Sequence, residues 1–495
     1  KCTLLNEEVK QYEPDEINNL ACFLTAYFED QISGTNIWNT FISLHKRHYN
    51  KPLPFFNVRD YIEGEINLAD LNFLIWYFFK LVDEEYNYNP IYPVHNFMAL
   101  QVLEVFEEEW EYAPENEKLL KFYQVDVQEN DYYSVRETIR KILTQTYLFY
   151  FDTGYKLLFE YEEILEKNQD HDHIDAILQE TSDNFLFKSR TKLLAMKGQE
   201  WLAEILTEEH PLYNDILHIS DKILSHFIYK DQTEEHIIIE HIASGKVFHL
   251  TKKSLEKPEE LCVENKAFYI GIVRWKDEWW FSGVFFTFNA DETFLQKEKN
   301  SMENKKAVNF LDWSDGKIAE ILEEKQEAFL RFNKGSLIAF MEANQVPEFI
   351  DNYISFHNRY LLDKRKETSS TSEPELSTDA KPKKSDYKVR ADHAIVFFNL
   401  KSGIEIIYDL ASAFPLPENP FFDLEDSEEH CIDLLEGDYV STEFTKYFLE
   451  HCTDKTPYLS EGFGRFYVHD LDFMLRFWKN ANYHTVPKLT INDSE

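Results

Sequence analysis

Apolar residues recur at intervals of three and four over most of the first 240 positions of the chain, which is the spacing of amphipathic helices. The first helix is expected to open at Pro14, with acidic residues in its first turn, and to end before Gly34. Ile17, Leu20 and Leu24 then share one face. This part of the chain therefore predicts a helical domain.

Further helices are expected from the same spacing together with capping residues. Asn67 can cap one of them, and Ser134 with Glu137 forms a capping box for another. Because no alternating pattern interrupts these segments, residues 1–240 are expected to contain almost no strand. The expected helices cover residues 68–85, 94–111, 134–151, 155–167, 189–207 and 216–229.

The pattern changes near residue 244, where alternation replaces helical spacing. Residues 246–251 alternate like a strand, and two aromatic, β-branched runs at 267–274 and 279–288 flank the polar residues Lys276-Asp277-Glu278. These runs predict an antiparallel hairpin. A second hairpin is expected from 394–399 and 403–409, a strand at 336–341, and helices at 315–332, 347–362, 441–452 and 470–480.

One segment has a composition that cannot build a core. Residues 364–388 lack aromatics until Tyr387 and are rich in Ser, Thr, Glu, Pro and Lys, so we expect a flexible tether or long loop. The chain then divides into an acidic helical domain (1–243), an α+β domain with the aromatic hairpin (244–363), the tether, and an α+β segment (389–495). The two hairpins either complete one sheet or belong to separate domains. The fold class is α+β, with a mostly helical N-terminal half and a mixed C-terminal half that holds a short antiparallel sheet.

Charge narrows the range of partners. The chain carries 90 acidic and 51 basic residues, a net charge of −39, and residues 1–242 alone carry −25. Nucleic-acid affinity depends on Lys and Arg that displace counterions, so nucleic acid is not an expected partner. Neither is a membrane, because no apolar run reaches the roughly 18 residues that span a bilayer. A protein partner, and a basic one in particular, fits such a surface better.

Cysteine usage indicates the compartment. The five cysteines are widely spaced and form no CxxC pair, which is typical of reduced thiols in a cytoplasmic protein. The chain begins at Lys1 without Met, so we expect that a preceding segment has been removed or omitted.

Motifs with known chemistry are missing from the sequence. It contains no GxxxxGK[ST], GxGxxG, GxSxG or HExxH, so no cofactor is expected and enzymatic activity is not favoured. Several histidines could ligate a metal, but each group has a simpler interpretation as an exposed or buried side chain, and we expect none of them to bind one. The groups considered are His45 with His48, His171 with His173, His236 with Glu240, and His430-Cys431 with His451-Cys452.

Three tryptophans beside the turn of the first hairpin are the candidate binding residues: Trp275, Trp279 and Trp280. Alternation places Trp279 and Trp280 on opposite faces of the strand, so at least one of them points away from the core of its own sheet. An exposed indole there would suit a partner or sugar surface. The alternative, which we favour, is that another layer of the protein covers it.

The tryptophan hairpin and the segment LDFMLRFWKNANYHTVPKLTI resemble large uncharacterised bacterial proteins of unknown function. The resemblance implies a bacterial origin and supplies no catalytic residue. The function expected from the sequence is a cytoplasmic protein-interaction or regulatory role. The alternative is a hydrolase, with or without a metal ion, whose carboxylates and histidines converge only in the folded chain.

Overall fold

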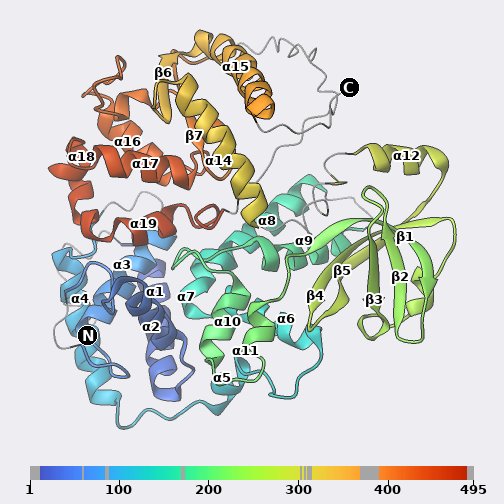
Figure 1. Ribbon diagram of the computed structural model, residues 1–495. Coiled ribbons are helices and arrows are strands. Elements are labelled where there is room, and N and C mark those ends of the chain that lie inside the picture. Colours follow the sequence, from blue (N-terminus) through green and yellow to red (C-terminus); the bar gives the residue numbers. More distant parts are fainter. Residues whose placement is uncertain are drawn as a thin grey trace. The chain divides into compact units, whose positions relative to one another are not determined.

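The computed structural model describes residues 12–57, 61–83, 88–168, 173–301, 304–305, 308, 315–367, 390–485 and 487. The chain divides into two compact units, Lys1–Asn309 and Phe310–Glu495. Helices fill the first part of unit 1 and a closed barrel follows them, whereas unit 2 combines a three-stranded antiparallel sheet with helices (Figure 1). The predicted α+β class is confirmed.

The helical part of unit 1 is built around α3 (Leu68–Val82), in which every side chain from Asp70 to Phe79 is buried. Local signals position its start as expected, since Asn67 and Asp70 form a capping box, but the helix ends at Val82 and not at residue 85. In the same way α1 (Pro14–Ser33) begins at its proline and ends at Gly34, whose φ is 66°. The other helices here are α2 (Ile37–Tyr49), α4 (Pro93–Glu109), α5 (Glu117–Phe122), α6 (Tyr132–Gln145), α7 (Tyr147–Phe149), α8 (Tyr155–Lys167), α9 (Ile174–Lys188), α10 (Gly198–Leu206) and α11 (Tyr213–Leu217).

Two helix predictions in this part need correction. α6 begins before the expected capping box, because Asp131 is its N-cap and accepts a hydrogen bond from the Tyr133 N–H at 2.9 Å. Glu137 instead pairs with the side chain of Arg140. The expected helix 134–151 is interrupted after α6, and a π-helical turn at Tyr150–Gly154 leads into α8. The expected helix 189–207 is helical only in α10.

A closed five-stranded barrel completes unit 1, with the strand order β1-β2-β3-β5-β4. Its strands are β1 (Ile223–Gln232), β2 (His236–His241), β3 (Val247–Thr251), β4 (Lys266–Trp275) and β5 (Glu278–Asn289), followed by α12 (Glu292–Asn300). All neighbouring strands are antiparallel except β3 and β5, which meet in parallel at Leu250 and Trp279. This order with one parallel contact is the topology of an OB-type barrel.

The barrel confirms one strand prediction and overturns another. Residues 267–274 and 279–288 pair antiparallel in β4 and β5, as expected. The helix predicted over 216–229 is wrong, since β1 and β2 lie before residue 242, and residues 1–240 are not free of strand. The sequence of β1 lacks a strand pattern because apolar residues lie on both of its faces. Ile223 and Phe227 point into the barrel, while Leu224 and Ile228 are half-buried on its outer side. A strand that buries both faces shows no clear alternation.

Unit 2 contains a three-stranded antiparallel sheet in the order β6-β7-β8. The second predicted hairpin is present as β7 (His393–Asn399) and β8 (Gly403–Tyr408), and β6 (Ile338–Glu342) pairs with β7. The two hairpins therefore belong to different sheets. Residues 368–388 of the expected tether lie outside the described residues.

Helices complete unit 2. Phe329 of α14 (Asp315–Phe332) and Tyr353 of α15 (Val346–Glu367) pack on the sheet core with Val396 and Phe398. The remaining helices are α16 (Ser427–Glu436), α17 (Thr442–Cys452), α18 (Pro457–Ser460) and α19 (Leu471–Trp478).

Candidate functional site

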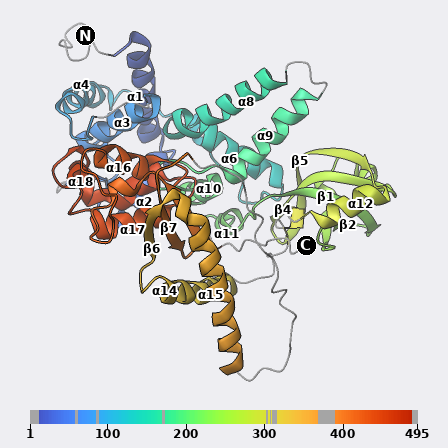
Figure 2. The same ribbon diagram turned by 90° about the horizontal axis from the view of Figure 1, so that it is seen from above.

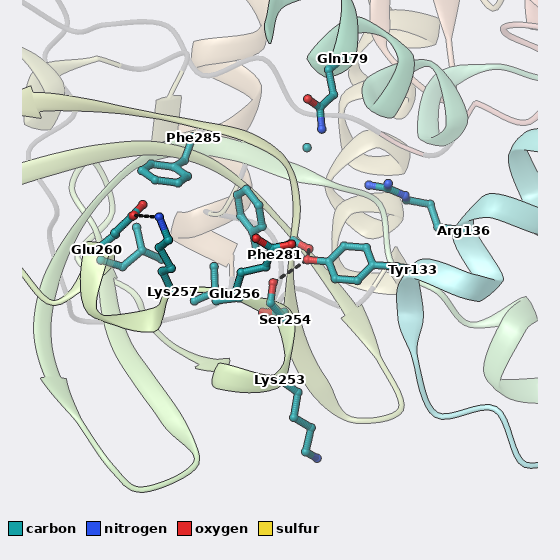
Figure 3. Close-up of a pocket in the computed structure, with 13 residues that line it drawn as sticks. Tyr133, Arg136, Gln179, Lys253, Ser254, Glu256, Lys257, Glu260, Phe281 and Phe285 are labelled. Atoms are coloured by element: carbon teal, nitrogen blue, oxygen red, sulfur yellow. Dashed lines mark hydrogen bonds and ion pairs between the residues drawn. The ribbon is translucent and has the colours of Figure 1, made fainter.

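A cleft of about 680 Å³ lies within unit 1, where the barrel meets α6 and α9. Its floor is formed by β5 and by the connection between β3 and β4, which contains short 3-10 turns at Lys252–Ser254 and Pro258–Leu261. Figure 3 shows Arg136 and Gln179 reaching toward it from the two helices, opposite Phe281 and Phe285. The residues that line the cleft include Tyr133, Arg136, Gln179, Ser254, Phe281 and Phe285.

The cleft exists because β3 is short. β3 pairs with β5 only at Leu250 and Trp279. After Trp279, β4 is the one strand paired with β5 in the described part of the chain. The side chains of Phe281 and Phe285 pack against the barrel core there, with ring centroids 6.2 Å apart. The floor of the cleft is therefore aromatic.

Tyr133 fixes the helical wall to this floor. Its hydroxyl lies 2.6 Å from the Ser254 carbonyl oxygen and 2.9 Å from the Phe281 carbonyl oxygen, and it donates toward them. Burial raises the pKa of Tyr133 above its ordinary value, so the phenol stays protonated and remains a donor. The Ser254 hydroxyl donates to the Thr251 carbonyl at 2.7 Å.

Arg136 brings a positive charge to the same wall. Its Nη1 donates to Asp183 Oδ1 at 2.7 Å, and its guanidinium carbon lies 5.2 Å from the centre of the Tyr133 ring. The side chain is 27% exposed. Arginine carries five N–H donors, and this one bond is the only one its guanidinium makes among the described residues.

A buried ion network stands behind Arg136 and joins α9 to the barrel. Lys222 Nζ lies 2.5 Å from Glu180 Oε1 and 2.6 Å from Asp183 Oδ2, and the Lys222 side chain is 2% exposed. Ser282 donates to Asp183 Oδ2 at 2.8 Å. Two cations thus balance two carboxylates, which is the condition under which buried charge is tolerated.

Glycine lets this network approach the sheet closely. Gly283 has a φ of +91°, and a Cβ there would lie 2.1 Å from Glu180 Oε2. That oxygen accepts the Val284 N–H at 2.9 Å, where the pairing register of β4 and β5 shifts. At Gly271 a Cβ would lie 2.5 Å from the Ser282 carbonyl oxygen. The carboxylate therefore occupies the space that a side chain would fill at this bulge.

The three candidate tryptophans surround a different part of the barrel. Trp279 is half-buried and packs inside it against Phe248, with ring centroids 5.0 Å apart. Trp280 points the other way and is 4% exposed because Tyr132 and Tyr133 of α6 cover it. Trp275 is 1% exposed. The helical layer covers the outward indole of Trp280. A binding role for the three tryptophans stays a prediction.

In the pair His430-Cys431 and His451-Cys452, the thiols are buried and the histidines are hydrogen-bonded elsewhere. Cys431 and Cys452 are buried, and burial raises the pKa of each thiol to about 12. Nδ1 of His430 is hydrogen-bonded to Ser412, and Nδ1 of His451 lies 2.8 Å from the Tyr447 carbonyl oxygen.

The described side chains of the other candidate ligand groups also have other partners or lie apart. His45 is buried with Nδ1 2.8 Å from the Lys51 carbonyl, whereas His48 is exposed. His236 lies 3.7 Å from Glu278, and Glu240 pairs with Lys230. His171 is outside the described residues. Among the described residues, there is no group of three or more His, Cys, Asp or Glu side chains that could hold a metal ion.

Comparison with known proteins gives a match to a family model over the N-terminal part of the chain. Residues 1–236 match the family model described as "Protein of unknown function (DUF3843)". The expected likeness to a family of unknown function is confirmed, but the match covers the N-terminal helices and not the tryptophan hairpin or the C-terminal segment. It includes the helical wall of the cleft and ends at the start of β2. Neither the curated proteins nor the solved structures give a match.

Within the described ranges, no helix is both long and apolar enough to cross a bilayer.

Proposed function

We propose that the protein is a cytoplasmic interaction or regulatory protein whose cleft binds an extended segment of a partner protein. The observation that carries the proposal is the combination of an aromatic floor with a single, partly exposed arginine on the wall. An apolar side chain of the partner fits against Phe281 and Phe285. The guanidinium of Arg136 then orients a neighbouring carbonyl or carboxylate group.

The wall of the cleft is held in place before a partner arrives. Tyr133 bonds to the floor, and Arg136 is tied through Asp183 to the buried lysine. A pre-formed site loses little conformational entropy on binding, which favours affinity. The hydroxyls of Tyr133 and Ser254 are engaged with backbone carbonyls, which supports a binding role for this cleft over nucleophilic chemistry.

Nucleic acid is not the ligand we propose, although OB-type barrels often bind it. Ile237, Ile239, Phe248 and Leu250 point into the barrel, so the alternate positions of β2 and β3 face outward. None of those outward positions is Lys or Arg: they are His236, Ile238, Glu240, Val247, His249 and Thr251.

A steric variant tests the cleft. Gln179 is exposed at its mouth, and Gln179→Trp would fill it, whereas Gln101→Trp places the same bulk on an exposed position of α4. Peptides selected from a random library on the wild-type protein should contain a large apolar residue. Gln179→Trp should weaken their binding at least about tenfold in a titration, equivalent to about 1.4 kcal/mol, and Gln101→Trp should not. Failure to enrich any peptide, or equal binding by both variants, would contradict the proposal.

A further inference from the structure

The helix α8 turns a broad apolar face to the solvent. Leu157 is its only buried residue. Tyr155, Leu158, Phe159 and Leu165 are 43%, 46%, 62% and 45% exposed. Large apolar side chains this exposed are unusual when they cluster on one element, and such clusters mark interaction sites.

The four residues form one surface because of their spacing. The last three lie three, four and ten positions after Tyr155. At about 100° per residue, Tyr155 and Phe159 point away from Leu157, and Leu158 and Leu165 lie beside them on one flank of the helix. Tyr150, 40% exposed in the preceding π-helical turn, extends this surface, with its ring centroid 5.3 Å from that of Tyr155. Figure 2 shows α9 running beside α8 on the side toward the barrel. We call Tyr150, Tyr155, Leu158, Phe159 and Leu165 the α8 face.

Two carboxylates lie within the α8 face. Glu162 and Glu166 are exposed, and the helical repeat places them between its leucines and its aromatic rings. Glu163 is also exposed and pairs with Lys167 at 2.9 Å, whereas Glu162 and Glu166 have no ion pair within the described ranges. An apolar surface with unpaired acidic groups complements a partner that is apolar and basic.

We propose that the α8 face docks an amphipathic helix of a partner protein that carries Lys or Arg among the apolar residues of its docking side. Apolar side chains of that helix would cover Leu158, Phe159 and Leu165, and its cations would lie against Glu162 and Glu166. The surface is separate from the cleft, so the inference does not depend on the proposed function.

A pair of matched leucines provides the test. Leu158 on α8 and Leu100 on α4 are 46% and 45% exposed, and Leu and Lys have similar helix propensities. The probe is a synthetic amphipathic peptide of Leu, Ala and Lys, about 18 residues long so that it can form a helix, labelled for fluorescence anisotropy with the full chain. A second peptide carries Glu in place of Lys.

We expect the Lys peptide to bind and the Glu peptide not to bind. Leu158→Lys should weaken binding by about tenfold or more, Leu100→Lys by less than about twofold, and Glu162→Lys should reduce both the affinity and its dependence on salt. The cleft variant Gln179→Trp should leave this binding unchanged, which separates the two proposals.

Three results would overturn the inference. Equal losses for Leu158→Lys and Leu100→Lys would show non-specific adsorption of the peptide. A concentration-dependent dimer that Leu158→Lys dissociates in light scattering would identify a second copy as the occupant. A fall in melting temperature for Leu158→Lys alone, without peptide, would show that the chain itself covers this face.

Discussion

Gly283 is the residue on which the geometry of the cleft wall depends most directly. It combines a φ of +91° with a position where the first side-chain carbon would displace the buried carboxylate of Glu180. We expect Gly283→Ala to lower the free energy of unfolding by about 3 kcal/mol, because backbone strain of about 1–2 kcal/mol adds to the loss of buried hydrogen bonds.

The matched control for this prediction is Gly245→Ala. Gly245 also has a positive φ, +72°, but no atom lies within 4 Å of the position that a Cβ would take there, so only the backbone strain of about 1 kcal/mol applies. Urea denaturation of both variants measures the difference. Equal destabilisation would mean that Glu180 moves aside without cost and that the close approach does not matter.

At the scale of the element, the β4–β5 hairpin carries a turn that its own residues do not favour. Lys276 and Asp277 have φ values of 46° and 62°, the type I′ geometry in which Gly is preferred at the second position. We expect Asp277→Gly to raise the free energy of unfolding by about 0.5–1 kcal/mol, since its exposed ion pair with Arg274 contributes little. A thermal melt would show the melting temperature rising; a fall would mean that the Arg274 pair stabilises the turn more than the strained backbone costs.

At the scale of the whole molecule, we expect net charge to determine which classes of macromolecule the protein binds. The net charge of −39 repels the phosphate backbone of DNA, and the outward positions of β2 and β3 lack the Lys and Arg that displace counterions from it. We expect no binding of random duplex DNA in fluorescence anisotropy at physiological salt. Submicromolar affinity would contradict this and would make the OB-type barrel a nucleic-acid module.

The sequence by itself determined several helix ends and turns, because their hydrogen bonds join residues that are close in the chain. Pro14 and Gly34 bound α1, Asn67 caps α3, and the aromatic runs at 267–274 and 279–288 pair across a two-residue turn. Each of these depends on hydrogen bonds or turns within a few positions, so the local pattern carries the information.

Only the tertiary structure decided where strands without a local signal lie and where the cleft forms. β1 resembles a helix in sequence because its two faces are covered by partners far along the chain. The cleft brings together residues about 150 positions apart, Tyr133 and Arg136 with Phe281 and Phe285. Their spacing in the sequence does not predict these contacts. Within the sequence, the site is indicated locally only by Gly283. A glycine inside an aromatic strand suggests a bulge, but it does not show which group packs against it. Contacts between distant segments depend on the packing of whole elements, and that packing is why the site emerges only in the folded chain.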